Sequence, residues 1–203
     1  MGILSPEALV ESRLRAAFKA ICANPVLLDD ALSRYSEGGA QQVRDFFRDR
    51  DIPVLAGWPL KAQQVPCVTV QLRPSDEPAD LQGMNVTAWE WEEGGETDMR
   101  TAIFRSVVCC TCYGNSQGEA TMLALVTKWV LLVMRQQLEL DGLMEQTIQV
   151  SDFEPIPSMF DQNTPWFLRS VNLTTTHEDS WNVANAPLIA AISVSPYDDR
   201  VAQ

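Results

Sequence analysis

The sequence has few residues of the kinds on which most enzymes and nucleic-acid-binding proteins depend. His177 is the single histidine among 203 residues, and the 15 Lys and Arg residues form no basic block against 27 Asp and Glu. The net charge of -12 disfavours binding to nucleic acid, because neutralising phosphates requires clustered cations. No P-loop, GxGxxG, HExxH or G-x-S-x-G motif occurs. We therefore expect no enzymatic activity, no cofactor and no bound metal.

Features of export and of membrane insertion are missing as well. The first residues, MGILSPEALVESRLRAAF, lack the charged and apolar regions of a signal peptide. The most apolar run, Met122–Met134, carries Lys128 and is shorter than the roughly 18 apolar residues that a membrane span needs. We expect a protein that is made in the cytoplasm and has no membrane partner. Its five cysteines, an odd number without an export signal, are expected to be free thiols.

Three of the cysteines cluster in one strand-like segment. On a strand, Cys110 and Cys112 share a face and Cys109 points to the other. Two thiolates on one face fall short of the four ligands of a structural zinc site, so we interpret these cysteines as buried apolar residues. A cysteine-dependent hydrolase that uses Cys112 and His177 is an alternative. His177 stands at the end of a strand-like segment, where we expect a solvated imidazole.

The strongest helix pattern runs from Gly118 to Gly142. Glu119 at its start and Arg135 near its end suit the helix dipole, and Gly142 is a plausible stop. The spacing predicts one buried stripe, made of Met122, Leu125, Val126, Trp129, Leu132, Val133 and Leu138. We interpret this segment as a scaffold helix; a solute-binding pocket beneath it is an alternative.

Other helices precede the strands. Ser5-Pro6-Glu7 is a good helix start, and a weaker helix is predicted over Val26–Tyr35. Gly38-Gly39 is expected to break the chain before a short helix that buries Val43, Phe46 and Phe47. In the first strand-like run, PCVTVQLRP, the residues Val68, Val70 and Leu72 alternate with Cys67, Thr69 and Gln71, which predicts a half-buried strand.

The longest strand-like segment, Met99–Tyr113, exceeds the usual strand length and predicts a bend, a bulge or a hairpin arm. Further strands are predicted over 85–91, 147–153, 166–176 and 188–194. This order predicts an α+β fold: a mixed, mainly antiparallel β-sheet with N-terminal helices and one long central helix packed on one face. We expect an N-terminal helical segment (1–50), a core (51–181) and a C-terminal β-extension with a tail (182–203).

Acidic residues concentrate between Arg73 and Arg100, a stretch without Lys or Arg. The candidate partner surface consists of Asp76, Glu77, Asp80, Glu90, Glu92, Glu93, Glu96 and Asp98. A solvated loop that keeps the protein soluble is one interpretation. A negative surface that repels DNA or complements a basic partner is the other.

Several segments taken together resemble bacteriophage tail terminator proteins, also called tail completion or neck proteins. The resemblance rests on the order of IPVLAGWPLKAQQVPCVTVQL, YGNSQGEATMLALVTKWVLLVM, LELDGLMEQTIQVSDFEPIP and WFLRSVNLTTTHEDSW. It covers roughly Arg44 to Trp181, and the residues after Trp181 have no counterpart in that pattern.

This resemblance implies a structural virion protein without a cofactor. Such proteins form a ring, expected to be hexameric, that caps the tail tube, stops its polymerisation and offers a docking surface to the head connector. The implied partners are the tail tube protein, head–tail connector proteins and, in contractile tails, the sheath. DNA would pass through without specific binding, and carboxylates among Asp76–Asp98 would line the lumen or the tube interface. Another neck or baseplate component of the same fold is an alternative.

Overall fold

The computed structural model describes residues 5–48, 50–57, 59, 64–73, 86–92, 95–157 and 165–182, with side chains described outside 86–92, 95–102 and 180–182. The chain divides into two compact units, one made of Ser5–Asp76 with Arg105–His177 and the other of Met1–Leu4, Glu77–Phe104 and Glu178–Gln203. The helices before residue 50 and most of the sheet therefore belong to the same unit. Within the described residues, no helix is both long and apolar enough to cross a membrane.

The N-terminal helices form the outer part of the larger unit. Their bounds are α1 (Pro6–Ala23), η1 (Pro25–Leu28), α2 (Asp29–Leu32) and α3 (Glu37–Phe47). The long helix α1 follows Ser5 and Pro6 as predicted and buries Val10, Leu14 and Phe18 against strands β1 and β2 and helix α4. The predicted helix over Val26–Tyr35 is instead one 3-10 turn followed by one α-helical turn.

Helix α3 corrects the expectation that Gly38-Gly39 breaks the chain. Both glycines lie in the first turn of α3, because Ser36 caps the helix by accepting a hydrogen bond from the Gly39 N–H at 3.3 Å. A cap before two glycines thus offsets their low helix propensity. The predicted burial of Val43, Phe46 and Phe47 is confirmed.

The sheet confirms the predicted α+β fold class. Its strands are β1 (Val54–Ala56), β2 (Cys67–Arg73), β3 (Val86–Glu92), β4 (Gly95–Gly114), β5 (Met144–Val150), β6 (Glu154–Pro157) and β7 (Pro165–Asn182). The neighbours follow the order β1-β2-β4-β7-β5, while β3 pairs with β4 and β6 with β7. Strand β1 is parallel to β2, whereas the β2–β4, β3–β4, β5–β7 and β6–β7 pairs are antiparallel.

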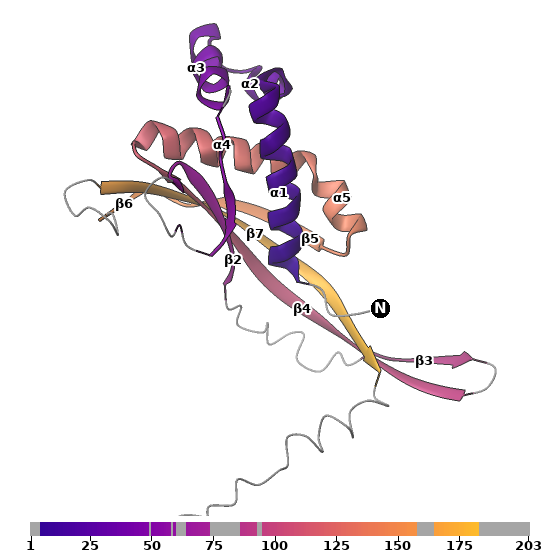
Figure 1. Cartoon of the computed structure of the whole chain (residues 1–203). Coiled ribbons are helices and arrows are strands. Elements are labelled where there is room, and N and C mark those ends of the chain that lie inside the picture. Colours follow the sequence, from indigo (N-terminus) through magenta and orange to yellow (C-terminus); the bar gives the residue numbers. More distant parts are fainter. Residues whose placement is uncertain are drawn as a thin grey trace, which may run out of the picture. The chain divides into compact units, whose positions relative to one another are not determined.

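Helices α4 (Gln117–Val133) and α5 (Arg135–Leu140) connect β4 to β5 and pack with α1 on one face of the larger unit's sheet (Figure 1). Strand β7 lies between β4 and β5. The crossover therefore passes over β7, so the two strands that it joins are not neighbours. The long strand β4 meets β2 with one half and β3 with the other, which confirms the hairpin alternative for Met99–Tyr113.

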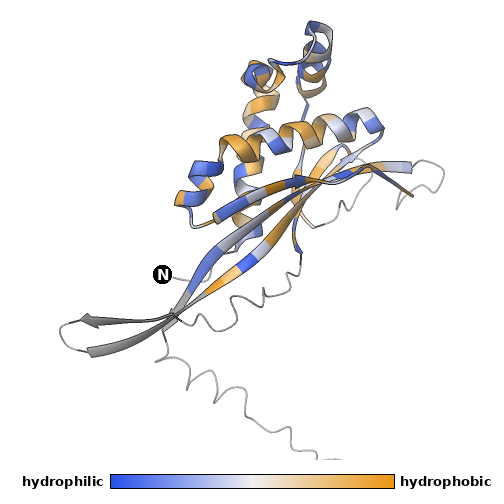
Figure 2. Cartoon of the chain, turned by 180° about the vertical axis from the view of Figure 1, so that it is seen from behind, coloured by the Kyte–Doolittle hydropathy of each residue, from blue (hydrophilic) through white to orange (hydrophobic). Residues whose placement is uncertain are grey.

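Of the predicted stripe of the central helix, only Val126 and Leu138 are confirmed as fully buried. Leu132 and Val133 are 48% and 62% exposed, and Met122, Leu125 and Trp129 are half-buried. The residues that α4 buries are Ala120, Leu123, Ala124, Val126, Thr127, Val130 and Leu131. Apolar residues extend along most of the helix (Figure 2), so the largest side chains do not mark its inner face. The inner face combines the large residues Leu123 and Leu131 with the small residues Ala120 and Ala124.

The ends of this connection were better predicted. Ser116 accepts a hydrogen bond from the Glu119 N–H at 3.2 Å, and the Glu119 carboxylate accepts one from the Asn115 N–H at 2.9 Å, as in a capping box. Helix α4 ends at Val133, two residues before Arg135, which begins the short helix α5 instead of lying near the end of one long helix. Gly142 follows α5 with φ 102°, a conformation that glycine adopts without steric cost, and so confirms the predicted stop.

Strand β2 is buried on both faces over Cys67–Val70, and Leu72 is 44% exposed, so the predicted half-buried alternation is wrong. The register explains why. Cys67 lies opposite Tyr113 on the sheet face away from α4, where both join a cluster with Val65 and Trp166. The Tyr113 and Trp166 rings meet edge to face at 6.1 Å. A second small core therefore covers the face that alternation assigns to solvent.

Candidate functional surfaces

The three clustered cysteines lie on β4, distributed as predicted. Cys110 and Cys112 pair across the sheet with Val70 and Val68, and the Cys112 Sγ lies 3.5 Å from the Thr127 Oγ1 of α4. Cys109 points to the other face, where its Sγ lies 3.4 Å from the Thr111 Oγ1. All five cysteines are free and buried, which confirms their interpretation as core residues.

The electrostatic environment of these thiols opposes ionisation. Burial raises the pKa of Cys112 to about 12 even though Thr127 lies within hydrogen-bond distance, and burial also raises the pKa of Cys67 to about 12. Burial also raises the pKa of Cys110, and the neighbouring Cys112 and Cys109 raise it further. Since the thiolate is the nucleophile and the metal ligand, these groups are inert at neutral pH.

These raised pKa values predict a loss of stability in alkali. A thiol whose pKa is higher in the folded than in the unfolded chain stabilises the fold fully below pH 9, and this contribution is lost as the pH rises from about 9 toward 12. At pH 10, each of Cys67 and Cys112 should lower the free energy of unfolding by about 1.4 kcal/mol. Urea unfolding of the wild type and of Cys112→Ala at pH 8 and pH 10 checks this. Between pH 8 and pH 10 the variant should lose about 1.4 kcal/mol less stability than the wild type. An equal loss in both proteins would contradict the raised pKa of Cys112.

The position of His177 differs from the sequence-based expectation. The residue lies on β7 and is 5% exposed, not solvated. Strand β7 continues past it to Asn182, so His177 does not lie at a frayed strand end. Among the described residues, no group of three His, Cys, Asp or Glu side chains is arranged to hold a metal ion.

The candidate acidic surface lies only partly in the described part of the chain. Asp76, Glu77, Asp80 and Glu93 lie outside the described residues. Glu90 and Glu92 are on β3, and Glu96 and Asp98 are on β4. The register pairs Glu90 with Thr97 and Trp91 with Glu96, so these four acids share one β-hairpin. We call the paired strand segments 86–92 and 95–98 the acidic hairpin.

A basic groove on the larger unit was not predicted from the sequence. It lies between α1 and the segment that leads into β1, has a volume of about 670 Å³ and is lined by the cations Arg15, Lys19 and Arg50 together with Asp51. Phe18, Cys22 and Ile52 supply apolar walls. We call it the α1–β1 groove. Asp51 in the groove, with Glu11 and Glu119 paired to Arg15 and Arg50, offsets the charge of the three cations.

The arginines of the α1–β1 groove are held by neighbouring groups. Arg15 pairs with Glu11 one turn earlier on α1 and donates a hydrogen bond to the Val54 carbonyl of β1 at 3.1 Å. Arg50 lies 4.7 Å from the centre of the Phe46 ring and 3.4 Å from the Glu119 carboxylate. Both ion pairs are solvent-exposed and contribute little, so the guanidinium groups keep donors for a ligand.

A second, apolar groove lies between α1, η1 and the end of α4. It measures about 190 Å³, and the residues that line it are Ala17, Ala20, Ile21, Leu27, Trp129, Val130, Val133 and Met134. Leu27 and Val133 are 48% and 62% exposed. Exposed apolar surface of this kind is common at contacts between proteins.

Compared with known proteins, the sequence matches no family model and no curated protein.

Proposed function

We propose that this protein is a structural component of a phage virion that forms a ring on the end of the tail tube. In this role it ends tube polymerisation and presents a docking surface to the head connector. It works through contacts between folded subunits and needs no cofactor. The proposed partners are other copies of the chain, expected to close as a hexamer, the tail tube protein and connector proteins.

The observation that carries this proposal is how the segments that resemble tail terminators assemble. They form β1 with β2, then α4, then β5 with β6, then β7. These elements lie in one sheet with α4 on one face. Segments that are far apart in the sequence thus belong to one fold, of the α+β class that the resemblance implies.

The surfaces of the described residues also support an assembly role. A closed ring requires a heterologous interface, in which one patch of each subunit meets a different patch of the next. The chain offers patches of opposite character: an acidic hairpin, a basic groove and an apolar groove. The thiol chemistry argues against the hydrolase alternative, because a Cys112 with a pKa of about 12 is not a nucleophile at neutral pH.

A tube-capping assay tests the proposal. The tail tube protein of the same phage is polymerised with and without the purified full-length chain, and tube lengths and ends are examined by negative-stain electron microscopy. We expect the chain to arrest elongation and to add a ring at one end of each tube. The His177→Ala variant should cap equally well. Unchanged tube growth with bare ends would contradict the proposed function, and loss of capping in His177→Ala would favour a role for that residue.

A further inference from the structure

Strand β5 is an edge of the larger unit's sheet, and its middle part is open for pairing. Among the described residues its one neighbouring strand is β7. The Ser151 N–H, just after β5, donates to the Ser170 carbonyl of β7 at 2.8 Å, in register with the ladder. In an antiparallel pair, residues whose main-chain groups face the neighbour alternate with residues whose groups face away. Gln149 therefore faces β7, whereas the N–H and C=O groups of Ile148 and Val150 point to the open side.

The open part of this edge is bounded at both ends. The register of β5 against β7 shifts between Met144 and Thr147, which ends regular pairing on one side. On the other side, Pro155 and Pro157 of β6 have no N–H to donate. Between them the segment Thr-Ile-Gln-Val carries no Lys or Pro, the residues that commonly protect a strand edge. This short segment is therefore a template for a further strand.

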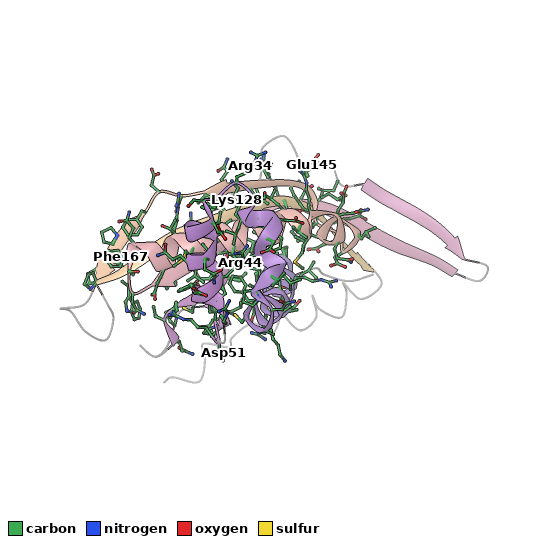
Figure 3. The ribbon with its side chains drawn as sticks, turned by 90° about the horizontal axis from the view of Figure 1, so that it is seen from above. Arg34, Arg44, Asp51, Lys128, Glu145 and Phe167 are labelled. Carbon is green, nitrogen blue, oxygen red and sulfur yellow. The ribbon has the colours of Figure 1, made fainter. Side chains whose placement is uncertain are left out.

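The opposite edge of the sheet is less available. Strand β1 has three residues, and Arg15 of α1 donates a hydrogen bond to the Val54 carbonyl at 3.1 Å. In the view from above, Glu145 of β5 and Asp51, which precedes β1, lie on opposite sides of the larger unit (Figure 3). A contact in which β1 of one copy extends β5 of another would have to displace Arg15. Pairing of β5 with β5 has no such obstacle.

Two groups of opposite charge lie beside the open edge. Arg135 donates to the Gln146 carbonyl of β5 at 3.2 Å, which holds its guanidinium group next to the strand. Asp152 follows the other end of β5, and both side chains are exposed. Neither forms an ion pair within the part of the chain that the structure describes. The edge thus offers one cation and one carboxylate to a partner.

We propose that two copies of the chain pair along β5 about a two-fold axis. A strand that pairs with its own copy across such an axis is antiparallel. Ile148 of each copy lies opposite Val150 of the other, so each pair exchanges two main-chain hydrogen bonds. The axis then passes between the two Gln149 residues, an uncharged pair without like-charge repulsion.

The same register accounts for the two charged groups. It places Asp152 of one copy opposite Gln146 of the other. The Gln146 side chain turns toward α5, where its Nε2 donates to the Arg135 carbonyl at 2.9 Å. Side chains of directly opposed residues lie on the same face of a sheet, so Asp152 reaches Arg135 of the other copy, and the pair occurs twice by symmetry. A second copy suits this edge better than an unrelated strand, because one surface supplies both charges.

This contact is isologous and therefore distinct from the heterologous contacts that close a ring. It goes beyond the proposed function and does not depend on it. In the free chain, it covers an edge that would otherwise be open to unspecific strand addition.

The test uses the purified full-length chain without the tail tube. Sedimentation equilibrium over a wide range of concentrations should show a monomer and a dimer in exchange. Ile148→Pro removes an N–H that points away from β7, so the ladder within the chain is kept, as for proline on natural edge strands. This change removes one hydrogen bond from each symmetric pair and should raise the dissociation constant at least about tenfold. Circular dichroism checks that the variant is folded.

The charged pair gives a second test that leaves the main chain unchanged. Asp152→Arg should raise the dissociation constant about three- to tenfold, and adding Arg135→Asp should restore part of the loss. Asp30→Arg is the matched control, because Asp30 is an exposed acid of α2 without an ion pair in the described part of the chain. It should leave the dissociation constant unchanged.

Hydrogen exchange of the wild type completes the test without any variant. The Ile148 and Val150 amides should become protected as the concentration rises, whereas the Gln149 amide, which faces β7, should be protected throughout. A chain that stays monomeric, or a dimer that leaves the exchange of Ile148 and Val150 unchanged, would overturn the inference. A folded Ile148→Pro variant that dimerises as the wild type does would also overturn it. Each of these results leaves the proposed ring function intact.

Discussion

Replacing Leu131 by alanine is expected to lower the free energy of unfolding by about 2–5 kcal/mol. Leu131 is 1% exposed on the inner face of α4, toward the sheet and β5. Truncation removes buried methyl groups and leaves a cavity between the helix and the sheet, whose strands cannot fully close around it. Urea unfolding at neutral pH, followed by far-UV circular dichroism, measures the change.

Leu132→Ala is the matched control one residue further along the same helix. Leu132 is 48% exposed and belongs to the stripe that the sequence pattern assigns to the core. Its truncation should change stability by no more than about 0.5–1 kcal/mol. If Leu132→Ala cost as much as Leu131→Ala, the orientation of α4 on the sheet would be wrong.

Gly114→Ala should destabilise the protein by about 1–3 kcal/mol or prevent folding. A Cβ atom at Gly114 would lie 2.6 Å from the Ala120 backbone nitrogen and 3.0 Å from the Ser116 carbonyl oxygen. These two atoms form the first hydrogen bond of α4, from the Ala120 N–H to the Ser116 carbonyl at 3.1 Å. Backbone atoms cannot move aside as a flexible side chain does, so the strand-to-helix turn must distort.

Gly118→Ala is the control for this glycine. Its added Cβ would meet only the Ser116 Oγ at 3.8 Å, an ordinary contact, in the first turn of α4. Alanine has the higher helix propensity, so stability should stay the same or rise by up to about 1 kcal/mol. Thermal unfolding of both variants checks the pair, and a Gly114→Ala protein as stable as the wild type would contradict the close packing of this turn.

Local chemistry explains which elements could be predicted from the sequence. The start of α1 at Ser5 and Pro6, the position of Glu119 in the first turn of α4 and the stop at Gly142 depend on neighbouring residues, which a reader of the sequence sees together. The alternation of Cys110 and Cys112 against Cys109 follows from strand geometry alone. The length of the Met99–Tyr113 segment predicted a bend, a bulge or a hairpin arm, and the pairing of β3 with β4 identifies the hairpin.

Tertiary contacts explain the errors. The inner face of α4 could not be identified by periodicity because leucine, valine and methionine occur nearly all round the helix. The second face of β2 is buried by Trp166, which is almost one hundred residues away, and no pattern within β2 indicates it. His177 was expected to be solvated because the predicted strand ends just before it, but β7 continues beyond it as a strand.

The α1–β1 groove could not be predicted for a related reason. Arg15 and Lys19 belong to the polar side of α1, and Arg50 belongs to a run of mixed charge after α3. Each looks like an ordinary solvated cation by itself. Packing of α1 beside β1 brings the three together around an apolar floor. A groove lined by several cations can thus form on an acidic chain without a basic cluster in its sequence.

Cryo-electron microscopy of the intact phage particle tests the central proposal most directly. We predict a ring of this chain at the head-proximal end of the tail tube, between the last tube ring and the connector, with the helical layer and the sheet of each subunit fitting the density. Its absence from the particle, or its presence at another position such as the baseplate, would contradict the assignment as a tail terminator.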